Sequence, residues 1–179
     1  MKITTKQLVQ TALLLALCIV FQTLKALSVY ITGSLVNAVL ILATLSIGLF
    51  GGLMIALASP VVAFLLGATP VMNLIPAMIP VVMAGNSIVV LAVYFLKKKN
   101  LVAGLLTGAV CKAGFLWLAV WFAILPLFSG NIPEAKRAVM VATVKTQFSL
   151  TQLITALIGS LIAWLVWARL KKVLTKENG

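Results

Sequence analysis

The stretch LVAGLLTGAVCKAGFLWLAVWFAILPLF, Leu101–Phe128, decides the fold class of this chain. It is longer than the ~20 helical residues needed to cross a hydrocarbon core of ~30 Å. Its one charge, Lys112, lies 11 residues past Leu101 and therefore near mid-membrane depth. Placing an ammonium there costs ~2.5–3.5 kcal/mol on insertion scales. Lys112 therefore packs among carbonyls inside a bundle, snorkels to an interface, or lines a functional cavity.

The composition of the whole chain indicates the same class. Of its 179 residues, 63% are hydrophobic, and the mean hydropathy is +1.23. These values exclude a soluble domain and a disordered chain. We expect an all-α, polytopic membrane protein with a single integral membrane domain over residues 1–179.

We expect six apolar segments to act as membrane spans. They are residues 8–24, 35–50, 53–66, 77–96, 101–128 and 146–168. The expected connections are Lys25–Ser34, a tight turn at Gly51 and Gly52, a loop over Gly67–Pro76, and a polar connection over Ser129–Lys145. Pro60 should kink the third span and free a backbone carbonyl.

The net charge of +12 follows the ends of the apolar segments and encodes topology rather than nucleic-acid binding. With six spans, one side carries nine basic residues: Lys2, Lys6, Lys97, Lys98, Lys99, Arg169, Lys171, Lys172 and Lys176. The other side carries four: Lys25, Lys136, Arg137 and Lys145. The positive-inside rule then predicts that both termini are cytoplasmic.

The residue types that are missing exclude most catalytic classes. The chain has no histidine, and its only acids are Glu134 and Glu177. These residues provide no zinc-protease motif, Ser–His pair, carboxylate dyad or intramembrane proton relay. We therefore expect no enzyme activity, no metal site, and an energy source outside this chain.

Asn86 and Lys112 are predicted to reach similar depth on consecutive helices. A lysine offers three donors and an asparagine offers both donor and acceptor groups. Together they can hold a carboxylate, a phosphate or a carbonyl-rich ring in an apolar cavity. The alternative is that Asn86 only joins helices, which is worth ~0.6 kcal/mol on average.

Further polar residues gather in the half of the spans that faces away from the cytoplasm, as an outward-open pocket requires. They are Asn37, Asn73, Gln147, Gln152 and Thr155. Trp117 and Trp121 either stack on a planar ligand or belong to the aromatic belt at the membrane surface.

Ala12 and Ala16 form a small-residue face on the first span. Such a face lets another helix approach closely, either inside this chain or from a partner.

With six spans in under 200 residues and the motif Ala12-Leu13-Leu14-Leu15-Ala16, the chain resembles the substrate-binding S components of energy-coupling factor (ECF) transporters. Within that family it resembles the riboflavin-transporter-like group. The resemblance covers nearly the whole chain and implies a multi-pass protein of the bacterial cytoplasmic membrane.

The resemblance implies that the protein captures a vitamin or related micronutrient from outside. It also implies docking through Ala12 and Ala16 on a transmembrane coupling subunit that is joined to two cytoplasmic ATPases. ATP would be used by those subunits, with no cofactor in this chain. The connection Lys25–Ser34, including Tyr30, would gate the pocket. Pocket residues differ among family members, so the candidates Lys112, Asn86, Trp117, Gln147 and Asn73 are inferred from this sequence alone.

Two other functions remain open at this stage. A stand-alone channel or passive transporter would use Lys112 in an anion-selective pathway. A structural or assembly membrane protein would bind no small molecule.

Overall fold

The computed structural model describes residues 4–24 and 28–177, and these contain helices and turns but no strand. The elements are α1 (Thr5–Thr23), α2 (Val29–Ser46), α3 (Leu49–Leu65), α4 (Pro70–Leu74), α5 (Met78–Leu96), α6 (Leu101–Ala119), a π-helical turn η2 (Val120–Ile124), α7 (Leu125–Phe128), a 3₁₀ turn η3 (Ser129–Asn131), α8 (Glu134–Gln147) and α9 (Leu150–Glu177). Among the described segments, five are long and apolar enough to cross a membrane, and α3 is a shorter apolar helix of 17 residues.

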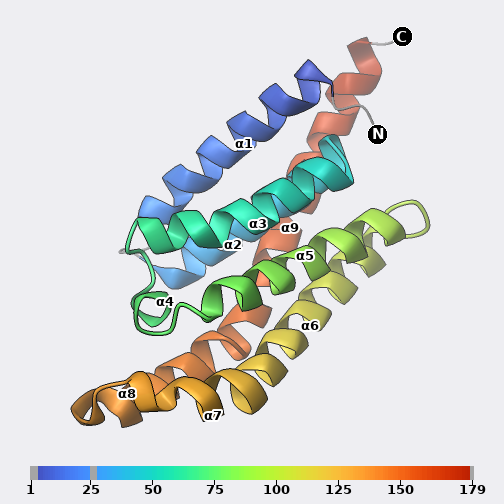
Figure 1. Cartoon of the computed structure of the whole chain (residues 1–179). Coiled ribbons are helices and arrows are strands. Elements are labelled where there is room, and N and C mark those ends of the chain that lie inside the picture. The colour runs from blue at the N-terminus through green and yellow to red at the C-terminus, as the bar shows by residue number, and fades with distance from the viewer. Residues whose placement is uncertain (1–3, 25–27, 178–179) are drawn as a thin grey trace.

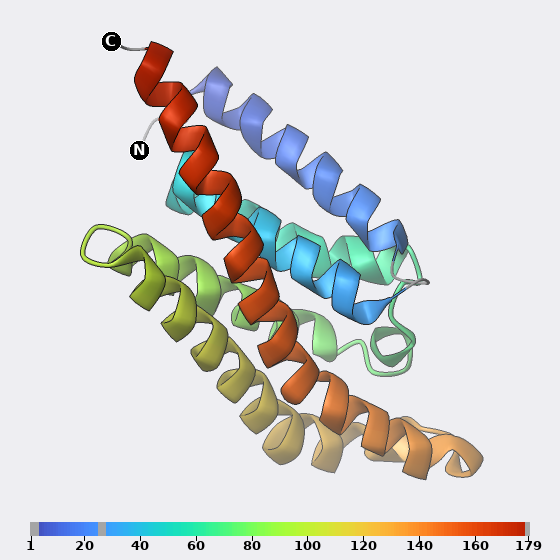
Figure 2. The same cartoon turned by 180° about the vertical axis from the view of Figure 1, so that it is seen from behind.

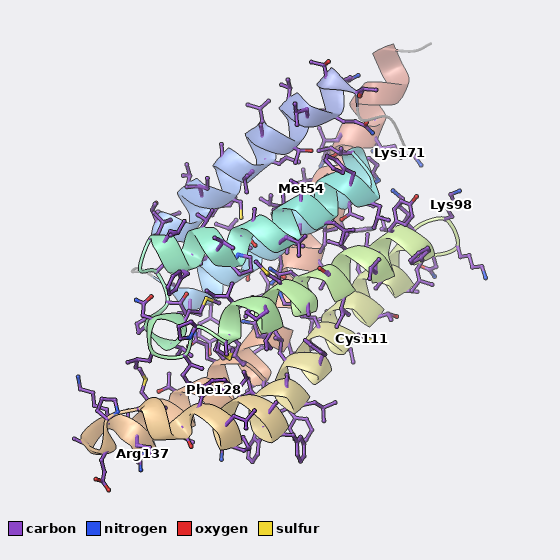
Figure 3. The ribbon with its side chains drawn as sticks, viewed as in Figure 1. Met54, Lys98, Cys111, Phe128, Arg137 and Lys171 are labelled. Carbon is purple, nitrogen blue, oxygen red and sulfur yellow. The ribbon has the colours of Figure 1, made fainter. Side chains whose placement is uncertain are left out.

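The long helices run back and forth between two ends of an elongated bundle (Figures 1 and 2). The start of α1, the α2–α3 turn, the α5–α6 turn and the end of α9 lie at one end, which we call the terminal end. The short helices α4 and α8 lie at the opposite end, which we call the α8 end. Lys98 and Lys171 mark the terminal end and Arg137 marks the α8 end (Figure 3).

Several predicted boundaries are wrong. The predicted turn at Gly51 and Gly52 lies inside α3, and the chain turns instead at Gly48, whose φ of 101° suits glycine. The second span begins at Val29 because the Ser28 hydroxyl accepts a hydrogen bond from the backbone N–H of Ile31 at 3.4 Å. The predicted connection over Lys25–Ser34 is thus helical from Val29, and its residues 25–27 lie outside the described chain.

The two longer predicted connections also contain helices. α4 interrupts the loop predicted over Gly67–Pro76, and α8 occupies most of Ser129–Lys145. Helix formers dominate the sequence of α8, and Glu134 in its first turn suits the helix dipole. The last long helix runs over Leu150–Glu177 rather than 146–168.

Three apolar clusters hold the bundle together. One lies at the α8 end, where Met78, Ile124 and Val144 join α5, η2 and α8. The second joins α1, α2, α3 and α5, and the third joins α2, α5, α6 and α9. Their members nearer the terminal end include Leu40, Ala43, Leu45, Ile55, Val93 and Leu105, all buried. The bundle is therefore apolar and well packed in its terminal half.

Candidate functional site

A pocket lies between the long helices toward the α8 end. Its empty volume is about 670 Å³, which includes open space at its mouth. Its lining comes from α1, α2, α3, α4, α5, α6, α8 and α9, and from the segments before α4 and between α8 and α9. Three lining residues place its mouth at the α8 end: Gln147 at the end of α8, Phe148 between α8 and α9, and Thr69 before α4.

The floor of the pocket is polar. On five long helices, the lining residue closest to the terminal end is polar: Asn37 on α2, Ser59 on α3, Asn86 on α5, Lys112 on α6 and Thr155 on α9. All five are buried. The pocket therefore ends at a layer of polar side chains, with the apolar clusters beyond it.

Lys112 is the centre of this floor. Its side chain is only 3% exposed, and Nζ donates to Asn37 Oδ1 at 2.7 Å and to Asn86 Oδ1 at 2.8 Å. These three residues come from α2, α5 and α6, and 75 residues separate Asn37 from Lys112. The sequence predicted only a similar depth for Asn86 and Lys112; in the structure they are hydrogen-bonded and both line the same pocket.

The polar contacts continue from Asn86 to α3 and α1. Asn86 Nδ2 donates to Ser59 Oγ at 3.3 Å, and Gln22 Nε2 donates to the Ser59 carbonyl at 2.8 Å. Asn86 Nδ2 also lies 3.5 Å from the Ala56 carbonyl. That carbonyl has lost its usual helical donor because Pro60, four residues later, has no N–H. One asparagine therefore supports both Lys112 and the proline-interrupted turn of α3.

The floor carries a lysine side chain without a carboxylate beside it. The partners of Lys112 are two neutral amides. The only acids of the sequence are Glu134, in the first turn of α8, and Glu177, at the end of α9. The described residues also contain no cluster of three His, Cys, Asp or Glu side chains able to hold a metal ion. The arrangement can bind an anionic or hydrogen-bonding small molecule, since it offers ammonium and amide groups in a dry setting.

The structure brings together only some of the predicted site residues. Lys112, Asn86 and Gln147 line the pocket, whereas Trp117, Asn73 and Tyr30 do not. Trp117 is five residues after Lys112, about 140° around the helix, and its exposed ring packs near Trp121 and Phe122.

Tyr30 and Asn73 lie outside the pocket for local reasons. Tyr30 is carried on the first turn of α2 and lines a separate shallow apolar groove with Ile158 and Ile162 of α9. Asn73 is exposed on α4, whose Met72 lines the pocket instead. The earlier start of α2 and the presence of α4 set both orientations, and neither was predicted.

Sequence reasoning missed the roles of Asn37, Gln22 and Ser59. Asn37 was expected among the outer polar residues but not as a partner of Lys112. Gln22, at the end of the first span, is only 4% exposed and joins α1 to Ser59. The sequence does show these residues as polar side chains inside apolar spans. It does not show which other helix each side chain contacts.

Ala12 and Ala16 are both exposed on the outer face of α1, beside the exposed side chains of Leu8, Leu13 and Leu17. Packing inside this chain, one of the two roles considered for these alanines, does not occur among the described residues. The small-residue face is open to a partner or to lipid.

The fold and the pocket define a class: a multi-pass helical membrane protein with a polar pocket closed at one end. The family model described as ECF transporter, substrate-specific component, matches residues 6–171, so the chain belongs to this family. No curated protein and no solved structure matched the chain.

Membership in this family makes the protein a transporter subunit that works with an ECF module, composed of a coupling subunit and ATPases. The riboflavin-transporter-like subgroup stays a prediction.

Proposed function

We propose that this protein captures a vitamin-like micronutrient from outside the cell in its pocket and releases it inside after docking on the ECF module. The observation that carries the proposal is the buried Lys112, held by Asn37 and Asn86 at the floor of a pocket that opens at the α8 end. An ionisable group inside a membrane protein marks a ligand or ion site by default.

The charge distribution supports an outward-facing pocket. At the terminal end, the basic positions of the described chain are Lys6, Lys97, Lys98, Lys99, Arg169, Lys171, Lys172 and Lys176. At the α8 end they are Lys136, Arg137 and Lys145. The positive-inside rule therefore favours a cytoplasmic terminal end. With α3 as a sixth span, both chain ends lie on that side and the pocket opens outward.

The packing below Lys112 favours capture over a channel. The terminal half contains buried Leu40, Ala43, Ile55, Val90 and Val93 from three neighbouring helices. A channel needs a continuous pathway lined by polar groups or water. The pocket instead ends at its polar floor, so a bound molecule leaves toward the cytoplasm only after the helices rearrange.

Docking is proposed at the exposed face of α1 that carries Ala12 and Ala16. Small side chains permit close contact with a helix of the coupling subunit. ATP is used by the partner ATPases, and this chain contributes substrate recognition.

The test is mass spectrometry of small molecules released by denaturation. The purified protein in nanodiscs is first incubated with the small-molecule fraction of rich growth medium and then washed. Val29→Trp places a large ring in the pocket lining, whereas Val102→Trp adds the same ring at an exposed site of α6 outside the pocket. We expect one stoichiometric compound from the wild type and from Val102→Trp, and none from Val29→Trp.

An empty wild-type protein, or equal release from both variants, contradicts capture in this pocket. In liposomes, uptake of the identified compound should require the ECF module and ATP. Uptake by the protein alone would favour a passive transporter instead.

A further inference from the structure

We propose that the substrate is a small organic acid held at two points: an anionic group on Lys112 Nζ, and an N–H or O–H group on Gln22 Oε1. This inference rests on the proposed capture function and names the chemistry that the pocket selects.

The first point follows from the unmatched charge of Lys112. Nζ has three donors, of which two are used by the amide oxygens of Asn37 and Asn86. The third has no partner among the described residues, and no lining residue of the pocket is a carboxylate: Glu134 lies in the first turn of α8 and Glu177 at the far end of α9. A buried ammonium without a counter-charge is costly, and an anion of the substrate supplies that counter-charge.

The two asparagines hold Lys112 in place and leave it as the anchor. Asn37 Nδ2 donates to the Gly33 carbonyl at 2.9 Å, and Asn86 Nδ2 donates to Ser59 Oγ at 3.3 Å. Because each amide nitrogen donates to one of these acceptors, each amide oxygen must be the atom that faces Lys112 Nζ. Each amide nitrogen already donates within the protein, and the charged ammonium is a stronger donor for an anion than a neutral amide.

The second point follows from an unused acceptor on α1. Gln22 Nε2 donates to the Ser59 carbonyl, which assigns the other end of the amide as the oxygen. Gln22 Oε1 is buried, belongs to a pocket-lining residue, and accepts no hydrogen bond from the described protein. Buried polar atoms are nearly always paired, so this oxygen selects a donor on the bound molecule.

The two points belong to one surface. Asn86 links Lys112 to the Ser59 hydroxyl, and Gln22 bonds the carbonyl of the same serine. Thr32 also lines the pocket, and its Oγ1 likewise has no partner in the described chain. An acid that also carries a donor group fits this pattern. A cation is disfavoured, because Lys112 repels it and no pocket carboxylate compensates.

The experiment compares the compound released by mass spectrometry, as an acid, with its neutral amide or ester. Affinities are measured for the wild type, Lys112→Met and Gln22→Leu in nanodiscs. We expect the wild type to prefer the acid by about tenfold or more, as charge-assisted hydrogen bonds give. Lys112→Met should bind acid and neutral derivative equally. Gln22→Leu should bind both about tenfold more weakly and keep the acid preference.

The ratio of the affinity for the acid to the affinity for the neutral derivative is compared within one variant. Loss of folded protein lowers the two apparent affinities equally, so a change in their ratio reports recognition rather than misfolding. Mass and fragmentation distinguish a carboxylate from a phosphate, and either satisfies the proposal. A stoichiometric ligand without an acidic group overturns the proposal while leaving the capture function intact. An unchanged acid preference in Lys112→Met also overturns it. If the protein releases no ligand, that result contradicts the proposed capture function and therefore this inference as well.

Discussion

Gly159→Ala tests whether the contact between α2 and α9 positions the floor of the pocket. A Cβ at Gly159 would lie 2.5 Å from the Ser34 carbonyl oxygen, 2.6 Å from Asn37 Cβ and 3.1 Å from the Ala38 nitrogen. Ordinary contact begins near 3.4 Å, so the helices must separate by about 0.9 Å. Two of the three atoms are backbone and cannot turn away. Overpacking of this kind costs ~1–3 kcal/mol.

The same shift affects the site. Asn37 moves with α2, and a shift of about 0.9 Å taken wholly along its 2.7 Å hydrogen bond to Lys112 would lengthen that bond to at most about 3.6 Å, beyond hydrogen-bond range. We therefore expect Gly159→Ala to lower both thermal stability and substrate affinity. Gly114→Ala on α6 is the matched control, because a Cβ there meets no atom within 4 Å. Both changes gain the helix propensity of alanine, worth ~1 kcal/mol, so their difference isolates the clash.

The assay is thermal unfolding followed with a thiol-reactive fluorescent dye. Cys111 is exposed on α6 (Figure 3) and is replaced by serine in all samples, which leaves fully buried Cys18 as the reporter. Gly159→Ala should melt several degrees below the Gly114→Ala control and bind the substrate more weakly. Equal melting and equal affinity for the two variants would refute the argument that this close approach sets the geometry of the floor.

Three further predictions concern the surface. Ala12→Trp should abolish co-purification with the ECF module without changing substrate affinity. The control Leu165→Trp, at an exposed position of α9, should leave co-purification and affinity unchanged. Equal loss of co-purification in the two variants would argue against docking at α1. In the background that lacks the exposed cysteine, an impermeant maleimide added to intact cells should label Lys136→Cys but not Lys98→Cys, and the reverse pattern would invert the proposed topology. Trp117→Leu should change substrate affinity by less than about twofold in a binding titration, because its ring lies outside the pocket; a larger loss would place the ligand elsewhere.

The sequence alone determined the class and most of the framework. Hydropathy over stretches such as Leu101–Phe128 predicts membrane-spanning helices, because backbone polar groups in lipid must be bonded within their own segment. Lys112 and Asn86 stand out for the same reason, as polar side chains that lipid does not tolerate without a partner. The family resemblance followed from this arrangement, and the match over residues 6–171 confirms the family.

Only the tertiary structure decided which of the polar residues share a site. In helices this uniformly apolar, the sequence does not indicate which face turns inward, so Trp117 was a candidate pocket residue beside Lys112. The crossing of α2 with α6 brings Asn37 to Lys112, and the packing of α1 on α3 brings Gln22 to Ser59. Such contacts depend on the rotation and crossing of helices far apart in the chain. These are set by side-chain packing among several helices at once, which no single segment encodes.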